Sequence, residues 1–414
     1  MHFPACDQVS VCLSYPFKGQ SITGDATYCH ETPQTKKLQL YPILYPIFLN
    51  DTLRAARNKK YFFISSGLRV QKTSPRASCS CRRTSRHLPS SQADGIIRGM
   101  SLTSDNPQIL IPDQWHDYAL LDSGNLQKLE RCGPYRFVRP EPQALWAPRL
   151  GPDQWQADGT FVASQGGRRD DSDDAEGGGW QLRDGLPADW QVGYQNLRFK
   201  ARPTPFRHLG FFPEQACHWD WCAAAIETAI KAGHPHRPRI LNLFAYSGIA
   251  SLHAANAGAE VTHVDASRKA IAHAFENRDE AGMQDAPIRF ITEDAARFVE
   301  REVRRGRQYD GIILDPPKYG RGPKGEVWRI ESDLVPLLDS CRQLLSQSSL
   351  FMLLTIYAIR ASSQAAHYAM REVMQADPAT AGGVVTSGEL ALAEAQADPR
   401  VISQANFARW QPAV

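Results

Sequence analysis

The chain has 414 residues, a formal net charge of +3 and 42% hydrophobic residues, which is typical of a folded globular protein and sufficient for two domains with hydrophobic cores. It has no apolar run of the roughly 18 residues that a membrane helix needs, and its N-terminus lacks the charged-then-apolar order of a secretory signal. We therefore expect no membrane partner. The scattered cysteines favour reduced thiols and a cytoplasmic location.

Charge divides the chain near residue 100. Residues 1–99 hold 14 Lys and Arg against 5 Asp and Glu, whereas the remainder holds 33 against 39. Residues 73–92 are rich in Ser and Arg and contain no acidic residue. We interpret residues 1–99 as a disordered or over-extended N-terminus before a start at Met100. An organellar transit segment and a basic tail that contacts nucleic acid are the alternatives.

Residues 100–205 consist of short β-type runs separated by Gly and Pro turns, a pattern that predicts a small β-rich accessory domain. Residues 164–180, SQGGRRDDSDDAEGGGW, predict a flexible polar loop within it.

A basic stripe is predicted near the end of this domain, in the segment LRFKARPTPFR. Apolar and basic residues alternate there, so the basic side chains share one face of a strand. They are Arg198, Lys200, Arg202 and, just beyond, Arg207. The stripe is either a solvated face or a contact for RNA phosphates.

From residue 206 to 414 the pattern changes to β-type runs that alternate with helical segments. This predicts an α/β fold, a Rossmann-like doubly wound sheet of seven strands. The fourth strand ends in Asp-Pro-Pro-Lys, because two prolines cannot donate ladder hydrogen bonds. A long helix to about residue 345 is expected after it, and two C-terminal strands are expected to close one edge.

Polar residues follow four of these strands, where a doubly wound sheet binds its ligands. The first strand is followed by Asn242, Ala245, Tyr246, Ser247 and Gly248. The second, third and fourth strands lead to Asp265, Asp294 and Asp315. Three aspartates at successive strand ends predict a polar edge with a ligand rather than three unrelated caps.

The residue types favour an adenosine without phosphates. Asp265 lies 21 residues after Phe244, the offset at which an acidic residue meets ribose hydroxyls. Asp294 is suited to accept a hydrogen bond from an exocyclic amine. The turn FAYSGIAS has one glycine instead of G-x-G-x-x-G, so pyrophosphate binding and a nicotinamide oxidoreductase are disfavoured. S-adenosylmethionine (SAM) fits best.

The motifs LNLFAYSG, VDAS, ENRDEAG and DPPKYG resemble, in this order, those of class I SAM-dependent methyltransferases, and most closely the bacterial large-subunit (23S) ribosomal RNA group. The segment GFFPEQACHWDW is similar to that group's entry segment, which helps to close over the cofactor. The resemblance covers about residues 206–357. It implies a SAM site that includes Phe212, Gln215, Asn242, Tyr246, Asp265, Asn277, Asp294 and Asp315. It also implies RNA as the substrate class.

The catalytic turn is expected at Asp315, Pro316, Pro317 and Lys318. There Asp315 and the following carbonyls would hold an acceptor in line with the SAM methyl group, and positioning would supply most of the acceleration. Methylation of cytosine C5 needs a cysteine nucleophile after the fourth or fifth strand. The sequence has none at DPPKYG or LLTIYAIR, so a nitrogen acceptor is favoured.

Several alternatives stay open. Asn277 is equally consistent with a helix cap, and Lys318 with a solvated charge. Cys217, His218 and Cys222 lack the spacing of common zinc sites, so no metal is expected. The rival functions are a methyltransferase for a protein or small molecule, and a non-catalytic SAM- or RNA-binding module.

Overall fold

The computed structural model describes residues 107–163, 178–322, 324–357 and 361–413, and within residues 1–106 only the strands β1 (Val11–Phe17) and β2 (Gln20–Ala26). The remaining expectations for residues 1–99 lie outside the described residues. Contacts divide the chain into Met1–Leu88 and Pro89–Val414, and all described elements other than β1 and β2 lie in the second unit. Within the described ranges, no helix combines the length and hydropathy needed to cross a membrane.

The larger sheet has the strand order β13–β12–β11–β14–β17–β19–β18–β3. Its first five members are parallel. They are β11 (Arg239–Leu243), β12 (Glu260–Asp265), β13 (Ile288–Thr292), β14 (Gly311–Leu314) and β17 (Phe351–Ile356). The predicted Rossmann-like doubly wound sheet is therefore confirmed. The order reverses between β11 and β14, and ligands bind at such a point.

Two long antiparallel strands, β18 (Val384–Ala393) and β19 (Val401–Gln411), complete the sheet, with β19 between β17 and β18. The short strand β3 (Gln108–Leu110) adds an eighth member beside β18, which the sequence did not predict. The backbone comes so close at this edge that a Cβ on Gly388 would lie 1.8 Å from the carbonyl oxygen of Gln108.

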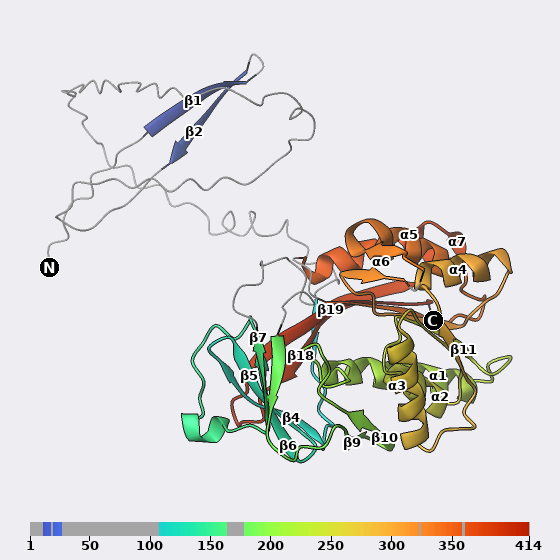
Figure 1. Cartoon of the computed structure of the whole chain (residues 1–414). Coiled ribbons are helices and arrows are strands. Elements are labelled where there is room, and N and C mark those ends of the chain that lie inside the picture. The colour runs from blue at the N-terminus through green and yellow to red at the C-terminus, as the bar shows by residue number, and fades with distance from the viewer. Residues whose placement is uncertain are drawn as a thin grey trace, which may run out of the picture. The chain divides into compact units, whose positions relative to one another are not determined.

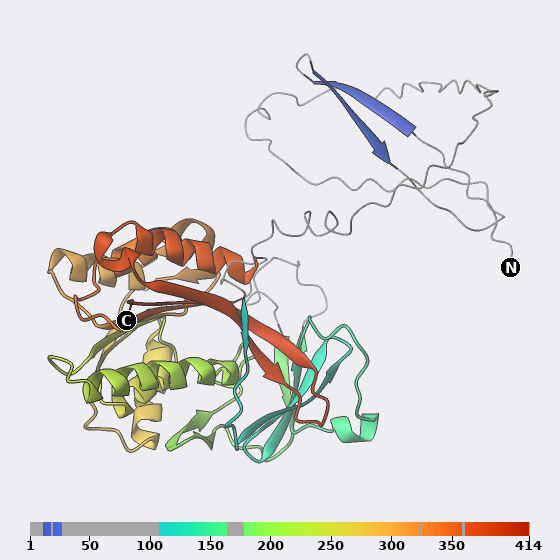
Figure 2. The ribbon, with the colours of Figure 1, turned by 180° about the vertical axis from the view of Figure 1, so that it is seen from behind.

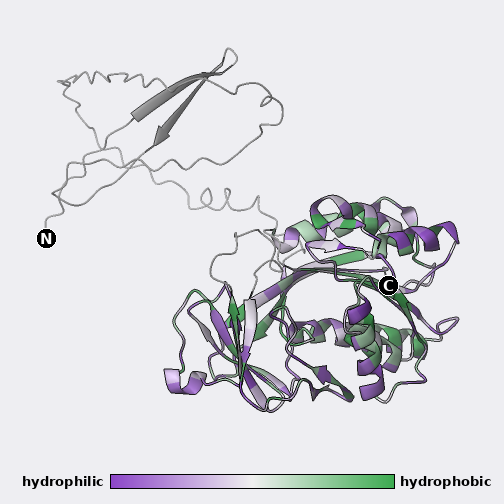
Figure 3. Cartoon of the chain, viewed as in Figure 1, coloured by the Kyte–Doolittle hydropathy of each residue, from purple (hydrophilic) through white to green (hydrophobic). Residues whose placement is uncertain are grey.

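Helices cover both faces of this sheet. One layer comprises α1 (Ala216–Lys231), α2 (Ile249–Asn256) and α3 (Arg268–Glu280), and the other α4 (Ala295–Arg304), α5 (Ile330–Arg342), α6 (Ser363–Gln375) and α7 (Pro378–Ala381) (Figure 1). The strands between them are mainly hydrophobic, and the helices combine both kinds of residue (Figure 3). Every residue of β14 and β17 is buried, as expected for strands covered on both faces.

The expected long helix after β14 is wrong in its length. A hairpin of β15 (Tyr319–Arg321) and β16 (Val327–Arg329) comes first, and α5 begins only at Ile330 and ends at Arg342. The glycines in YGRGPKGEV explain the difference, because glycine favours turns over helix interiors.

The accessory region contains a five-stranded sheet, β4–β5–β6–β7–β8, and a separate hairpin of β9 (Trp190–Tyr194) and β10 (Leu197–Ala201). The sheet consists of β4 (Tyr118–Gly124), β5 (Gln127–Cys132), β6 (Tyr135–Pro140), β7 (Gly159–Ala163) and β8 (Gly178–Leu182). The loop predicted at 164–180 is therefore wrong for residues 178–180, which are strand, and residues 164–177 lie outside the described part. The domain boundary at residue 205 stays a prediction.

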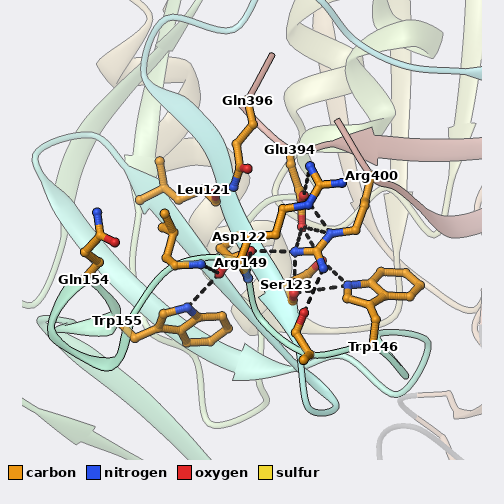
Figure 4. Close-up of polar contacts among 12 residues, drawn as sticks. Leu121, Asp122, Ser123, Trp146, Arg149, Gln154, Trp155, Glu394, Gln396 and Arg400 are labelled. Carbon is orange, nitrogen blue, oxygen red and sulfur yellow. Dashed lines mark hydrogen bonds and ion pairs between the residues drawn. The ribbon is translucent and has the colours of Figure 1, made fainter. Parts of the chain in front are cut away.

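The strands β18 and β19 extend from the large sheet to this smaller one (Figure 2). Buried polar groups join the two, as Figure 4 shows. Arg400 donates to Asp122 Oδ1 at 2.6 Å and to both oxygens of Glu394, and the Ser123 hydroxyl also donates to Glu394. Asp122 and Glu394 are nearly inaccessible, so each buried carboxylate has the hydrogen bonds that burial requires.

Candidate active site

The loop after β11 has an unusual backbone. Phe244 and Tyr246 have φ values of 55° and 47°, and Gly248 has 83°. A Cβ on Gly248 would lie 2.9 Å from the Cβ of Ala274, so both the conformation and the space require glycine. Helix α2 begins at the next residue, and its first amides are available for an anionic group.

Asp265, at the end of β12, holds this loop in place. Its Oδ2 accepts from the Tyr246 amide at 2.9 Å and its Oδ1 from the Ser267 amide at 2.7 Å. Burial raises the pKa of Asp265, and the two amide donors oppose that rise. Each carboxylate oxygen has a second lone pair, which leaves room for a pair of ribose hydroxyls.

Two asparagines lie beneath the same loop. Asn242 donates to the Ser251 hydroxyl at 2.9 Å. Asn277 donates to the Ser247 carbonyl at 2.8 Å and accepts from the Lys200 amide of β10 at 2.9 Å. Both side chains are buried. Through its two hydrogen bonds, Asn277 connects the loop after β11 to β10 in the accessory region. A direct role of either residue toward the cofactor stays a prediction.

Asp294 lies at the end of β13 and caps α4, with its Oδ1 accepting from the Arg297 amide at 3.1 Å. It is half-buried, and the cap uses only its Oδ1. The cap does not use the full acceptor capacity of the carboxylate, so the predicted contact with an exocyclic amine stays compatible with the geometry.

Asp315, at the end of β14, has an unsatisfied buried acceptor. Its Oδ2 accepts from Gln215 Nε2 at 3.2 Å, whereas its Oδ1 is buried without a hydrogen-bond partner. Burial, and next the nearby Glu214 carboxylate, raise the pKa of Asp315 well above its ordinary range. A buried oxygen without a partner is costly, which marks this atom as a place for a donor from a ligand.

Gln215 links Asp315 to Tyr357, the first residue after β17. Its Nε2 also donates to the Tyr357 hydroxyl at 2.8 Å, and its Oε1 lies 3.1 Å from His218 Nδ1. Burial and the neighbouring carboxylates Asp315 and Glu214 raise the pKa of Tyr357 well above its ordinary value, so the phenol stays protonated. Glu214 and Tyr357 were not predicted, although Tyr357 follows the fifth strand as Asp315 follows the fourth.

Aromatic rings connect this cluster with the loop after β11. The ring of Phe212 lies 5.3 Å from that of Tyr357 and 5.8 Å from that of Tyr246, between centroids. Phe212 and Gln215, which were singled out by resemblance alone, are thus brought to the same edge as Tyr246 and Asp315. Pro316 is buried, and the Pro317 carbonyl accepts from Trp328 Nε1 at 2.6 Å.

The accessory region positions the segment that carries Phe212 and Gln215. Trp115 Nε1 donates to the Pro213 carbonyl at 2.9 Å, and its ring centroid lies 5.6 Å from that of Phe211. Arg139 of β6 donates to the Arg207 carbonyl at 2.9 Å. The small sheet therefore contributes to the geometry of the site, although its own strands carry none of the predicted site residues.

The predicted basic stripe is partly neutralised. Lys200 Nζ lies 3.6 Å from Asp189, and Arg202 pairs with both Asp189 and Glu276. Arg198 is exposed and donates to Gln191 at 3.1 Å. These partners favour a solvated face at β10, and the RNA contact of the stripe stays a prediction.

Among the described residues, one group could hold a metal by composition: His234, His236 and Asp310. Both nitrogens of His234 already face carbonyl oxygens, at 2.8 Å and 3.2 Å. The group precedes β11 and β14, at the sheet edge opposite Asp315. The described cysteines are buried or half-buried, and burial raises the pKa of Cys217 and Cys222 to about 12.

Comparison with solved structures identifies the family. The chain is 47% identical to the SAM dependent methyltransferase from Agrobacterium tumefaciens, with a TM-score of 0.68, over 74% of this chain and 94% of that one. This chain belongs to the SAM-dependent methyltransferases. A putative methyltransferase from Streptococcus mutans is 13% identical with a TM-score of 0.52 and shares the fold.

Shorter matches fall on the catalytic half. The family model of conserved hypothetical protein 95 matches residues 221–327. Ribosomal RNA large subunit methyltransferase K/L from Shewanella baltica is 40% identical over 110 residues, which are 26% of this chain and 15% of that protein. A putative ribosomal RNA large subunit methyltransferase from Methanocaldococcus jannaschii is 36% identical over 99 residues, 24% of this chain and 25% of that protein.

The residues fit the methyltransferase's cofactor. The left-handed Gly248 has no side chain in the loop, Asp265 offers acceptors for hydroxyls, and Asp315 Oδ1 has no hydrogen-bond partner. SAM supplies an electrophilic methyl group when bound. That residues of this chain hold the acceptor in line and take up its proton stays a prediction.

Proposed function

We propose that this methyltransferase modifies a nitrogen atom of RNA, with large-subunit ribosomal RNA as the substrate. The names of the curated relatives support the substrate class, although the matched stretch covers only 15% of the Shewanella protein's length. The observation that carries the acceptor type is the buried, unpartnered Asp315 Oδ1. It is an acceptor only while the carboxylate is ionised or protonated on its other oxygen, and an N–H group is the complementary donor.

The proton balance favours such an acceptor. Methylation of a nitrogen that carries a hydrogen releases that proton, and Asp315 with its raised pKa is suited to receive it. Cytosine C5 would instead need a thiolate. The described strand ends beside Asp315 carry no cysteine, and Tyr357 stands at the position after β17.

The alternative substrate is a protein or a small molecule, with the accessory region enclosing the pocket. The contact between Trp115 and Pro213 is the observation that favours it, because the accessory region holds the entry segment. This alternative predicts no salt-dependent binding of RNA.

A transfer assay separates the two. The full chain and SAM with a labelled methyl group are offered total RNA, and separately protein extract, from cells that lack the gene. We expect label in RNA that is lost with Asp315→Ala, and nucleoside mass spectrometry then names the base. Label in protein or small molecules alone would overturn the RNA proposal. A 5-methylcytosine product would overturn the nitrogen acceptor.

A further inference from the structure

The hairpin of β15 and β16 begins four residues after Asp315. Its register pairs Tyr319 with Arg329, Gly320 with Trp328 and Arg321 with Val327. Side chains alternate between the faces of a strand, so Tyr319, Arg321, Val327 and Arg329 share one face. We call this the outer face of the hairpin.

The opposite face is fixed to the active site. Trp328 is 5% exposed, and its Nε1 donates to the Pro317 carbonyl in the catalytic turn. Its ring centroid lies 5.2 Å from that of Phe244 in the loop after β11. The Ile330 amide also donates to the Lys318 carbonyl at 3.0 Å. The hairpin therefore has a defined position relative to both strand ends that form the site.

The outer face is exposed, basic and aromatic. Tyr319 and Val327 are 39% and 51% exposed, and both arginines are exposed. Arg321 Nε donates to the Tyr319 hydroxyl at 3.1 Å, and the Arg329 guanidinium lies 5.8 Å from the centre of the Tyr319 ring. The two arginines are thus ordered by one aromatic ring.

The carboxylates near the hairpin already have other hydrogen-bond and ion-pair partners. Glu326 pairs with Arg297 of α4 and accepts from the Lys324 amide. Asp333 accepts from the Arg329 amide and the Ser332 hydroxyl. Among the described residues, neither guanidinium of the outer face has a carboxylate partner, in contrast to Lys200 and Arg202 of the stripe at β10.

We infer that the outer face binds a single-stranded RNA segment beside the nucleotide that is methylated. Arg321 and Arg329 contact phosphates, and the exposed Tyr319 ring stacks on a flanking base. Arginine forks and an aromatic face are the combination that single-stranded nucleic acid requires. The inference rests on the proposed RNA substrate and replaces the stripe at β10 as the main RNA contact.

The test uses the full chain with Arg321→Ala and Arg329→Ala combined. We expect the KM for RNA to rise about tenfold or more, and the slope of log KM against log salt to fall by roughly 1.4, about 0.7 for each lost phosphate contact. SAM affinity and Tm should not change. The matched control combines Lys231→Ala and Arg237→Ala, which removes the same charge from exposed positions at the opposite edge of the sheet.

A second pair of variants tests stacking. Tyr319→Phe should keep the wild-type KM within about threefold, whereas Tyr319→Ala should raise it about tenfold, since stacking on one base contributes about 1–3 kcal/mol. If the double alanine variant has a lower Tm, the Arg321→Gln, Arg329→Gln pair takes its place.

The outcomes separate the two proposals. RNA methylation with unchanged KM and salt slope in the double variant would overturn the role of the outer face and leave the RNA substrate standing. Transfer to protein alone by the wild-type enzyme would overturn both. A rise in KM of the same size in the Lys231, Arg237 control would show a general charge effect and overturn this assignment.

Discussion

Two carboxyl groups in this methyltransferase, the buried Glu130 and the half-buried Asp315, have opposite surroundings. Glu130 of β5 accepts two hydrogen bonds from Arg139, at 2.6 Å and 2.8 Å, and one from the Tyr118 hydroxyl. Asp315 accepts one long hydrogen bond and has an oxygen with none. Burial would raise both pKa values, yet Arg139 and Lys128 lower the pKa of Glu130 to about 2, whereas that of Asp315 stays raised.

We propose that this difference separates a group that stabilises the fold, Glu130, from a group that takes part in the chemistry, Asp315. A fully paired buried charge fixes one arrangement of the chain, and its removal leaves other buried groups without partners. An unpaired one has capacity left for a ligand and a pKa suited to proton transfer. The surroundings of Glu130 and of Asp315 are adjacent. Glu214 interacts with Lys128 and Arg139 on one side and with Asp315 on the other.

The largest expected effect comes from Asp315→Ala. Methyl transfer should fall by about 10²- to 10⁴-fold, the usual contribution of a positioned acid–base group. The free energy of unfolding should stay constant or rise, because the variant removes a buried group with an unsatisfied oxygen. Single-turnover transfer and thermal unfolding measure the two quantities. A large loss of stability would mean that Asp315 is structural, like Glu130.

Glu130→Gln should have the opposite effect to Asp315→Ala, because its main loss should be in stability and not in methyl transfer. We expect the free energy of unfolding to fall by about 3–5 kcal/mol, since Arg139 is left buried without its charge partner. The control is Glu227→Gln, whose exposed pair with Lys231 contributes about 0.3–0.5 kcal/mol. Urea titration measures both. Equal losses in the two variants would refute the contrast drawn here.

Wild-type stability should also follow the pKa of Glu130. The group is ionised in the folded state down to about pH 2 and in the unfolded chain only above its ordinary value of 4.5. The ionised Glu130 therefore contributes its full amount to the free energy of unfolding above pH 4.5, and this contribution is lost as the pH falls toward 2. Glu130→Gln should show a shallower loss over this range.

Asp265→Ala should weaken SAM binding by more than tenfold, since it removes a charge-assisted acceptor pair of about 1.5–3 kcal/mol. Calorimetric titration measures the affinity. Asp285→Ala, an exposed acidic residue after α3, serves as the control. Unchanged affinity in Asp265→Ala would remove this residue from the cofactor site.

The smallest expected effect is on the pH dependence of methyl transfer. Transfer should rise with pH as Asp315 loses its proton, with a midpoint above the ordinary carboxyl range, because burial and the nearby Glu214 carboxylate raise its pKa. The Gln215 donor opposes this, so Gln215→Leu should move the midpoint to higher pH. Gln343→Leu, exposed after α5, is the control. A midpoint that shifts downward would contradict the assignment.

The parallel strands and the positions of their ends were accessible from the sequence. Fully apolar runs predict buried parallel strands, and the two prolines after Asp315 mark where β14 stops. The carboxyl ends of parallel strands meet at one edge of a sheet. The strand ends therefore also predicted that this edge carries Asp265, Asp294 and Asp315.

Contacts between distant segments were not accessible. The link from Gln215 to Tyr357 spans 142 positions, and no local pattern specifies it. The same applies to Asn277, whose buried amide joins Ser247 to Lys200. The hairpin at β15 was missed because a glycine-rich turn was read as part of a helix.

The position of β19 has a consequence for biosynthesis. This strand lies between β17 and β18 in the sheet, yet it follows both of them in the sequence. The partner of Asp122 near the start of the accessory sheet, Arg400, is 278 residues away. The large sheet cannot complete its pairing until β19 has emerged from the ribosome. We therefore expect β17 and β18 to stay without their shared neighbour during synthesis of the residues between them and β19, when such unpaired edges are prone to aggregate.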